Sequence, residues 1–218
     1  MDQFVELARS RRSVRKFTDE SVPREDVARM LEAASCAPSG GNAQPWLFVA
    51  VDDREVILKC RKVVEDGIES LNSLLPGLAE SDRKRLQGRL RSFSLFFSGA
   101  PVVIFAFVES GEGPLVRALV DSGVSAADAE TMLGHVGIVS AAAAVENLLL
   151  AAHSMGYGAC WMHPPFFAKE GIAGLLGVGS GHELMAIVPV GRPAERPAPP
   201  AKKPSASVSR FIPPSRPR

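Results

Sequence analysis

Cysteine is scarce in this sequence. The 218 residues include three cysteines, Cys36, Cys60 and Cys160, which lie far apart and form no C-x-x-C pair. An odd number of widely spaced cysteines predicts neither a disulfide framework nor a zinc-binding knuckle. The pattern is typical of a protein in a reducing compartment, so we expect a cytoplasmic location.

An excess of charge of one sign is also absent. The chain has 25 Lys and Arg against 24 Asp and Glu, which gives a formal net charge of +1 at pH 7. This balance provides no overall basic field that would attract nucleic acid or an anionic membrane. We therefore expect no nucleic-acid partner, and any site for an anion must be built locally.

Long apolar runs are missing as well. The N-terminal stretch, MDQFVELARSRR, has no apolar segment of the kind that a secretory signal needs. The most apolar run, residues 136–152, is interrupted by Ser140, Glu146 and Asn147 and falls short of the roughly 20 apolar residues that cross a bilayer. We interpret this run as a buried helix and expect no membrane partner.

What the sequence does contain is typical of one folded domain. Hydrophobic residues make up 46% and charged residues 22% of a chain long enough for one well-buried core. Apolar spacing and end signals predict helices over residues 23–36, 54–75, 81–97, 131–155 and 168–177, with a break at Pro76 and Gly77 and a surface connection with some helix over 109–130. Short apolar runs between turn residues predict strands over residues 46–51, 100–108, 156–162 and 183–191.

The C-terminal segment differs in composition from the rest. From residue 189 onward the chain has nine prolines in thirty residues, which excludes a regular helix or a central strand. The segment is either a disordered end or an extended arm that lies on another surface. We expect a single domain over residues 1–205 and a Pro/Arg-rich tail over residues 206–218.

Metal and nucleophile sites find little support. His135, Glu146 and His153 share one face of the predicted helix, but a rise of 1.5 Å per residue separates the two histidines by about 27 Å. They cannot bind one ion. No G-x-S-x-G motif occurs, and Cys160 lies in an apolar run that favours a core position over a reactive thiol.

The stretch RRSVRKF, residues 11–17, concentrates positive charge around one hydroxyl. If it is extended, Arg11, Ser13 and Arg15 share one face, and Arg12 and Val14 share the other. Two guanidinium groups and a hydroxyl match the charge and the terminal oxygens of a phosphate monoester. A solvated basic turn explains this stretch equally well when it is considered alone.

A second polar motif follows the first predicted helix. The stretch APSGGNAQPW, residues 37–46, carries Ser39, Asn42 and Gln44 on a glycine-containing turn. Each amide side chain has a donor and an acceptor, and so could bind a heterocycle edge on which C=O and N–H alternate, as in a flavin. The alternative is a polar turn whose amides cap the preceding helix or the loop itself.

Together, these two motifs resemble the nitroreductase family. R-x-S-x-R near the start, A-P-S-x-x-N-x-Q-P-W about thirty residues later, APVVIFAF, HVGIVSAAAAVENLLLAAHSMGYGACWM and AIVPVGRPAERPAPPAKKP occur in the family's order. The resemblance covers residues up to about 200, except for the helical stretch near 60–97. It implies an α+β, nitroreductase-like fold with a mixed, mainly antiparallel central sheet flanked by helices and a C-terminal arm that extends onto a partner subunit.

The resemblance also implies an activity. The protein would be an FMN-dependent homodimer in which NADH or NADPH passes hydride to flavin N5, after which a small electron-poor acceptor, such as a nitroaromatic or a quinone, binds in the same place and is reduced. The flavin would carry the chemistry, so no side chain is expected to be catalytic. By matching positions, the implied FMN-binding residues are Arg11, Arg12, Ser13, Arg15, Pro38, Ser39, Asn42, Gln44, Lys202 and Lys203, with the residues of the 38–44 turn coming from the other subunit.

One loop departs from the family's pattern. Many members place a backbone N–H opposite flavin N5, but this chain has WMHPPFF at residues 161–167, and Pro164 and Pro165 have no N–H. Met162 or His163 would have to donate that hydrogen bond. Two alternatives remain open: specialised flavin chemistry on the same fold, namely dehalogenation or flavin fragmentation, and a flavin-binding protein without turnover.

Overall fold

The core of the protein is a four-stranded sheet. A computed structural model describes residues 2–74, 77–109 and 114–212. The strands are β1 (Trp46–Val51), β2 (Val102–Glu109), β3 (Gly158–Ala159) and β4 (His182–Gly191), in the order β1-β2-β4-β3 with antiparallel neighbours. An isolated parallel bridge joins Ser13 to Ala159 at the β3 edge. The predicted α+β fold with a mainly antiparallel sheet is confirmed.

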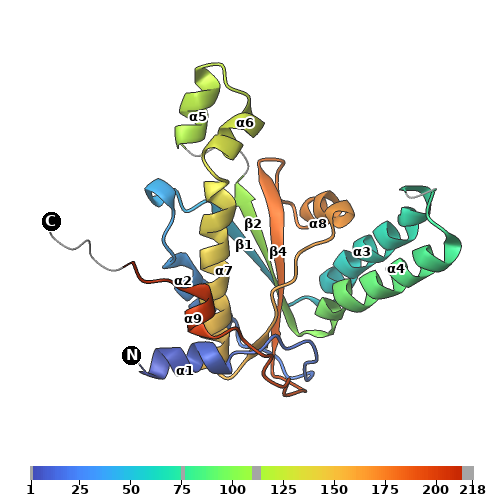
Figure 1. The fold of residues 1–218 in the computed structure, drawn as a ribbon. Helices are drawn as coiled ribbons and strands as arrows, with labels where there is room; N and C mark the ends of the chain where they lie inside the picture. Colours follow the sequence, from blue (N-terminus) through green and yellow to red (C-terminus); the bar gives the residue numbers. More distant parts are fainter. Residues whose placement is uncertain (1, 75–76, 110–113, 213–218) are drawn as a thin grey trace.

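The helices cover both faces of the sheet. Figure 1 shows α2 and α7 on one face, with α3, α4 and α8 on the other. The described helices are α1 (Asp2–Ser10), α2 (Arg24–Ser35), α3 (Arg54–Leu74), α4 (Glu80–Ser94), α5 (Pro114–Asp121), α6 (Ala126–Met132), α7 (Val136–Ser154), α8 (Lys169–Leu175) and α9 (Ser205–Val208). The short α5 and α6 lie beyond one end of the sheet, at the start of α7, whereas α1 lies near its other end.

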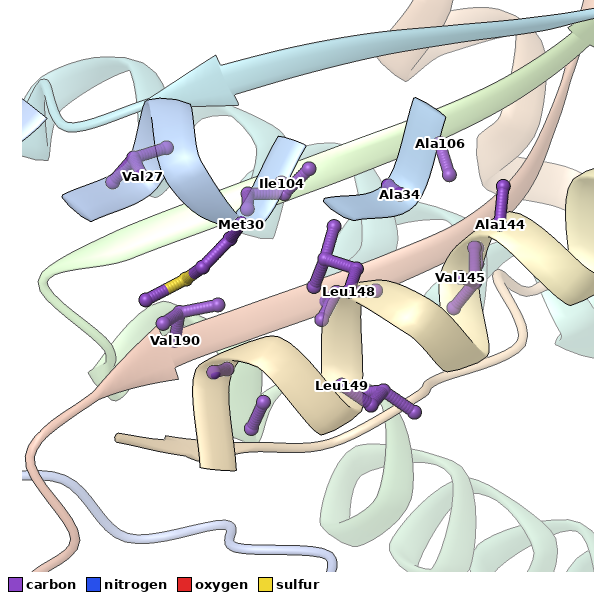
Figure 2. Packing of buried hydrophobic residues seen from close by; sticks show 14 of the residues in the cluster. Val27, Met30, Ala34, Ile104, Ala106, Ala144, Val145, Leu148, Leu149 and Val190 are labelled. Atoms are coloured by element: carbon purple, nitrogen blue, oxygen red, sulfur yellow. The ribbon is translucent and has the colours of Figure 1, made fainter. Parts of the chain in front are cut away.

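Strand β2 is buried on both sides because it lies between the two helical layers. Its side chains alternate between two hydrophobic clusters, as the two-residue period of a strand requires. Val102, Ile104, Ala106 and Val108 face α2 and α7, whereas Val103, Phe105 and Phe107 face α3 and α8. Figure 2 shows the first cluster, in which Met30 of α2 and Leu148 of α7 lie together with Ile104.

Helix α7 is the main support of one sheet face. Among the described residues it is the one helix long and apolar enough to cross a membrane by length and composition. Its inner side, including Ala144, Val145 and Leu148, packs into the cluster with β2 and α2. The buried-helix interpretation of residues 136–152 agrees with this packing.

Three predicted boundaries were wrong or lie outside the described residues. Helix α7 begins at Val136 rather than at residue 131, because Gly134 and His135 have positive φ angles of 69° and 54° that separate α6 from α7. The strand predicted over 156–162 shrinks to Gly158–Ala159 and a bridge from Met162 to Ile187. The predicted break at Pro76 lies outside the described residues.

Candidate functional site

The arginine-rich segment 11–15 is fixed against the edge of the sheet. Ser13 bridges Ala159, and the Val14 N–H donates to the Ala159 carbonyl at 3.0 Å. Val14 is 6% exposed and packs over Gly158, where an added Cβ would lie 2.8 Å from the valine Cβ. The alternation predicted for this stretch therefore holds at Val14, which faces inward.

The C-terminal part of the chain fastens the same segment from its other side. The Thr18 N–H donates to the Arg192 carbonyl, and the Ala194 N–H donates to the Lys16 carbonyl, each at 2.9 Å. Glu195 Oε1 accepts a hydrogen bond from the backbone N–H of Arg15 at 2.9 Å. Sequence reasoning missed Glu195, although its place in the G-R-P-A-E turn beside the predicted lysine pair was visible.

The three arginines of this segment have different surroundings. Arg11 Nε lies 3.5 Å from Glu146 Oε1 of α7. Arg12 Nη1 donates to the Arg11 carbonyl at 2.8 Å and to the Arg9 carbonyl at the end of α1. Part of the Arg12 guanidinium group therefore caps that helix. Arg15 is exposed, and its Nη1 donates to the Ser13 carbonyl at 3.3 Å.

A cavity of about 620 Å³ brings most of the predicted phosphate-binding residues together. The residues 197–202 form one wall, so Lys202 reaches the arginines although it is almost two hundred residues away in sequence. Lys203 is exposed and is not among the lining residues. The lining comprises Phe4, Val5, Ala8, Arg9, Arg11, Arg12, Ser13, Arg15, Pro197, Ala198, Pro199, Pro200 and Lys202. A hydroxyl and several cations beside an apolar wall suit a ligand with a phosphate and a less polar body.

The second motif forms a tight exposed turn. Gly41, Asn42 and Gln44 have φ angles of 60°, 55° and 47°, a left-handed conformation that is uncommon for residues with side chains. Ser39 stabilises the turn, because its Oγ accepts a hydrogen bond from the Gln44 N–H at 3.0 Å. The turn is thus capped by the Ser39 hydroxyl, whereas the alternative predicted capping by the amides.

The side-chain amides of Asn42 and Gln44, unlike the Ser39 hydroxyl, take no part in holding the turn together among the described residues. Asn42 and Gln44 are exposed, and neither side-chain amide has a hydrogen bond to any residue that the structure describes. Their donors and acceptors are therefore free to bind a ligand edge. Backbone strain that leaves unpaired amides at the surface is a feature of binding sites.

The second motif contributes Pro38 and Ser39 to a different cavity from that of the arginine segment, and Asn42 and Gln44 line neither of these two cavities. Pro38 and Ser39 line a separate hollow of about 310 Å³, whose other walls are formed by the start of α7, including Val136 and Val139. None of the lining residues is shared with the arginine cavity.

The loop at 162–167 settles one of the two alternatives for the flavin N5 donor. The Met162 N–H donates to the Ile187 carbonyl at 2.9 Å, and the Ile187 N–H donates back at the same distance. The Met162 N–H is therefore occupied within the sheet, and the expectation that it faces a ligand is not supported. His163 is exposed, and its role stays a prediction.

Glu146 and His153 of α7 contact the junction between α1 and the arginine segment. His153 Nε2 lies 2.9 Å from Ser10 Oγ, and Glu146 pairs with Arg11. His153 lines a second cavity of about 340 Å³ together with Arg11 and Arg12. Burial lowers the pKa of His153, and the charges of Arg11 and Arg12 lower it further, so the imidazole is neutral at pH 7.

Cys160 lies beneath the arginine segment. Its side chain is buried, and burial raises the pKa of the thiol against the opposing effects of Arg15, Ser13 and Arg11. A thiol with a raised pKa is a poor nucleophile at neutral pH. The prediction of a core position for Cys160 is confirmed.

Known proteins share both the sequence pattern and the fold. Residues 8–192 match the Nitroreductase family. A relative from Methanothermobacter thermautotrophicus, provisionally named an NADH dehydrogenase/NAD(P)H nitroreductase, is 28% identical over 195 residues, which are 88% of this chain and 78% of the relative.

Two solved structures extend the comparison to three dimensions. A BluB-like flavoprotein from Clostridium difficile 630 is 28% identical with a TM-score of 0.85, over 96% of this chain and 98% of that one. An iodotyrosine deiodinase bound to FMN and 3-iodo-L-tyrosine is 26% identical with a TM-score of 0.67, over 92% and 95% of the two chains. The family match spans most of the sequence and the α+β architecture is shared, so this chain belongs to the nitroreductase family of flavoprotein oxidoreductases.

Proposed function

We propose that this protein binds FMN and reduces a small electron-poor acceptor, such as a nitroaromatic or a quinone, at the expense of NADH or NADPH. The observation that carries the proposal is the 620 Å³ cavity in which Arg11, Ser13 and Arg15 meet Lys202. FMN, when bound, would supply the redox chemistry by accepting hydride at N5 and passing the electrons on. The chain's own residues would bind and orient the cofactor.

The donor set of this cavity fits a phosphate monoester. A phosphate carries nearly two negative charges and three terminal oxygens, which two guanidinium forks, a hydroxyl and an ammonium can satisfy. Arg12 has part of its fork bound to carbonyls, so we assign it to the positive field near the pyrimidine side of the flavin rather than to the phosphate. The backbone N–H of His163, an exposed residue, is the remaining candidate for a hydrogen bond to N5.

We further propose that the working form is a homodimer. Pro38 and Ser39 of the amide turn and the cations of segment 11–15 line separate hollows of one chain. A second copy could supply the amide turn to the arginine cavity. Val136, Ile138 and Val139 of α7 are 42%, 44% and 64% exposed, an apolar surface next to the turn that a second copy would cover.

The tail fits the same proposal. Phe211 and Ile212 are 93% and 85% exposed, and nothing in the described part of the chain covers them. We propose that the proline-rich segment up to about residue 205 extends over a partner subunit as an arm and that Phe211 and Ile212 lie against the same partner. The cytoplasmic location suggested by the sparse, unpaired cysteines remains part of this proposal, with no nucleic acid or membrane as a partner.

A visible absorption spectrum tests the proposal. Protein loaded with FMN should show a flavin spectrum that bleaches under anaerobic addition of NADH or NADPH and recovers when a nitroaromatic or quinone is added. A colourless protein that takes up no FMN would contradict the cofactor assignment. A flavin spectrum that neither nucleotide bleaches would instead favour a flavin-binding protein without turnover.

Two substitutions test the phosphate-binding residues. Arg11→Ala or Ser13→Ala should weaken FMN binding by about tenfold to a hundredfold, since each removes a charge-assisted hydrogen bond worth roughly 1.5–3 kcal/mol. Lys84→Ala is a matched control, because Lys84 is an exposed cation paired with Glu80 on α4. Native FMN affinity in both site variants would show that the segment binds something else.

A second candidate activity is reductive dehalogenation of an aromatic amino acid. The observation that favours it is the similarity to the iodotyrosine deiodinase structure, which covers 92% of this chain. Iodide release from 3-iodo-L-tyrosine by the reduced, FMN-loaded protein would support this activity. Rapid reoxidation by quinone without any iodide release would favour the first candidate.

A further inference from the structure

Helix α7 carries one acidic side chain, and that side chain faces the arginine segment. Within Val136–Ser154 the remaining residues are apolar or neutral, apart from His153 in the last turn. Glu146 Oε1 lies 3.5 Å from Arg11 Nε, and the side chains are 48% and 23% exposed, respectively. The carboxylate therefore acts on the cation that we assign to the cofactor phosphate.

The contact is an ion pair without a good hydrogen bond. A separation of 3.5 Å is longer than the usual 2.7–3.2 Å of an N–H···O bond. The terminal nitrogens of Arg11 donate to no group within the described residues, so the fork is left for a ligand in the cavity. A loose contact on one side of the guanidinium orients it much less than a bidentate pair would.

The backbone of Arg11 is held independently of Glu146. Its N–H donates to the Leu7 carbonyl at 3.1 Å, and Ser10 Oγ lies within hydrogen-bond distance of His153 Nε2. Removing the Glu146 charge therefore leaves the end of α1 attached to α7. The remaining effect of the carboxylate on the site is electrostatic.

We propose that Glu146 competes with the cofactor phosphate for Arg11 and thereby lowers the affinity of the site for FMN. The inference rests on the proposed function, in which Arg11 binds that phosphate. FMN must displace this partly exposed ion pair to use the full charge of Arg11, and such a pair is worth up to about fivefold in an equilibrium constant. Glu146 thus acts on the cofactor through Arg11.

The test compares FMN with riboflavin, which lacks the phosphate. In Glu146→Gln the dissociation constant of FMN, measured by quenching of flavin fluorescence, should fall about twofold to fivefold, whereas that of riboflavin should not change. In the Arg11→Ala background the same substitution should have little effect on FMN. Glu69→Gln is a matched control, because Glu69 is 64% exposed and pairs with Arg91 on the α3–α4 hairpin.

The outcomes separate this inference from the proposed function. Weaker FMN binding in Glu146→Gln would show that Glu146 orients Arg11, and unchanged FMN binding would show that it has no effect; either result overturns the inference alone. If the native protein does not prefer FMN to riboflavin, the phosphate assignment fails, and this inference fails with it. An unchanged unfolding midpoint of the variant without cofactor confirms that it is folded.

Discussion

The close contact between Gly158 and Val14 gives a direct test of how the site is built. Gly158 lies on β3, and a Cβ added there would be 2.8 Å from both Cβ and Cγ1 of Val14 and 2.9 Å from Cγ2. Contacts below 3.0 Å do not persist in real structures, so the arginine segment would have to shift away from the sheet. The Val14 N–H bond to the Ala159 carbonyl opposes that shift.

We expect Gly158→Ala to lower the free energy of unfolding by about 1–3 kcal/mol, the usual range for an overpacked core contact. Gly174→Ala in α8 is the matched control, because no atom lies within 4 Å of its added Cβ. Replacing that helical glycine should raise the free energy of unfolding by about 0.5–1 kcal/mol. Urea unfolding of the protein without cofactor measures both values.

A second substitution checks the cause. Val14→Ala in the Gly158→Ala background should recover only part of the stability, because the valine Cγ contacts disappear while the Cβ contact at 2.8 Å remains. Displacement of the segment should also weaken FMN binding, although neither residue touches the ligand in our proposal. A Gly158→Ala protein as stable as the native one would refute the packing described for the site.

Two further predictions concern titrating groups. Tyr157→Phe removes the hydrogen bond from the phenol to Asp26 at 2.6 Å and should reduce stability by about 1.5–3 kcal/mol in urea unfolding. Burial and that bond raise the Tyr157 pKa, so its contribution is complete below about pH 10 and is lost as pH rises through the raised value. At pH 8, maleimide should modify the exposed Cys36 and should not modify Cys60 or Cys160, as mass spectrometry would show. Both of these thiols are buried, and burial raises the pKa of Cys160 and raises that of Cys60 to about 11.

Local sequence signals located most of the fold. Strand β1 occupies the predicted residues 46–51, because an apolar run between Pro45 and a pair of aspartates leaves little choice of boundary. The start of α7 was missed although Gly134, with φ 69°, is the glycine that commonly follows a helix end; His135, with φ 54°, gave no such signal. Helix α1 was not predicted either; its contacts with α7 depend on tertiary structure.

The site was predictable only where it is local. Alternation along residues 11–15 follows from the period of an extended chain, so Arg11, Ser13 and Arg15 could be grouped from spacing. The engagement of the Met162 N–H with Ile187 depends on how the loop pairs with β4, which no local pattern encodes. The same holds for Glu195, whose carboxylate reaches a backbone N–H 180 residues earlier in the sequence.

Helix α7 runs from the hollow lined by Pro38 and Ser39 to the arginine segment, and so constrains how two copies could bring the two motifs together. Val136 and Val139, at the start of the helix, form a wall of that hollow. Glu146 and His153, further along, contact Arg11 and Ser10. In an isologous dimer a surface pairs with its own copy, and antiparallel α7 helices would set the start of one beside the end of the other. In the homodimer that we propose, that arrangement would cover the exposed Val139 and would bring the Asn42 turn of one subunit to the arginines of its partner. In a single chain the hollow at the start of α7 and the arginine cavity have no lining residue in common.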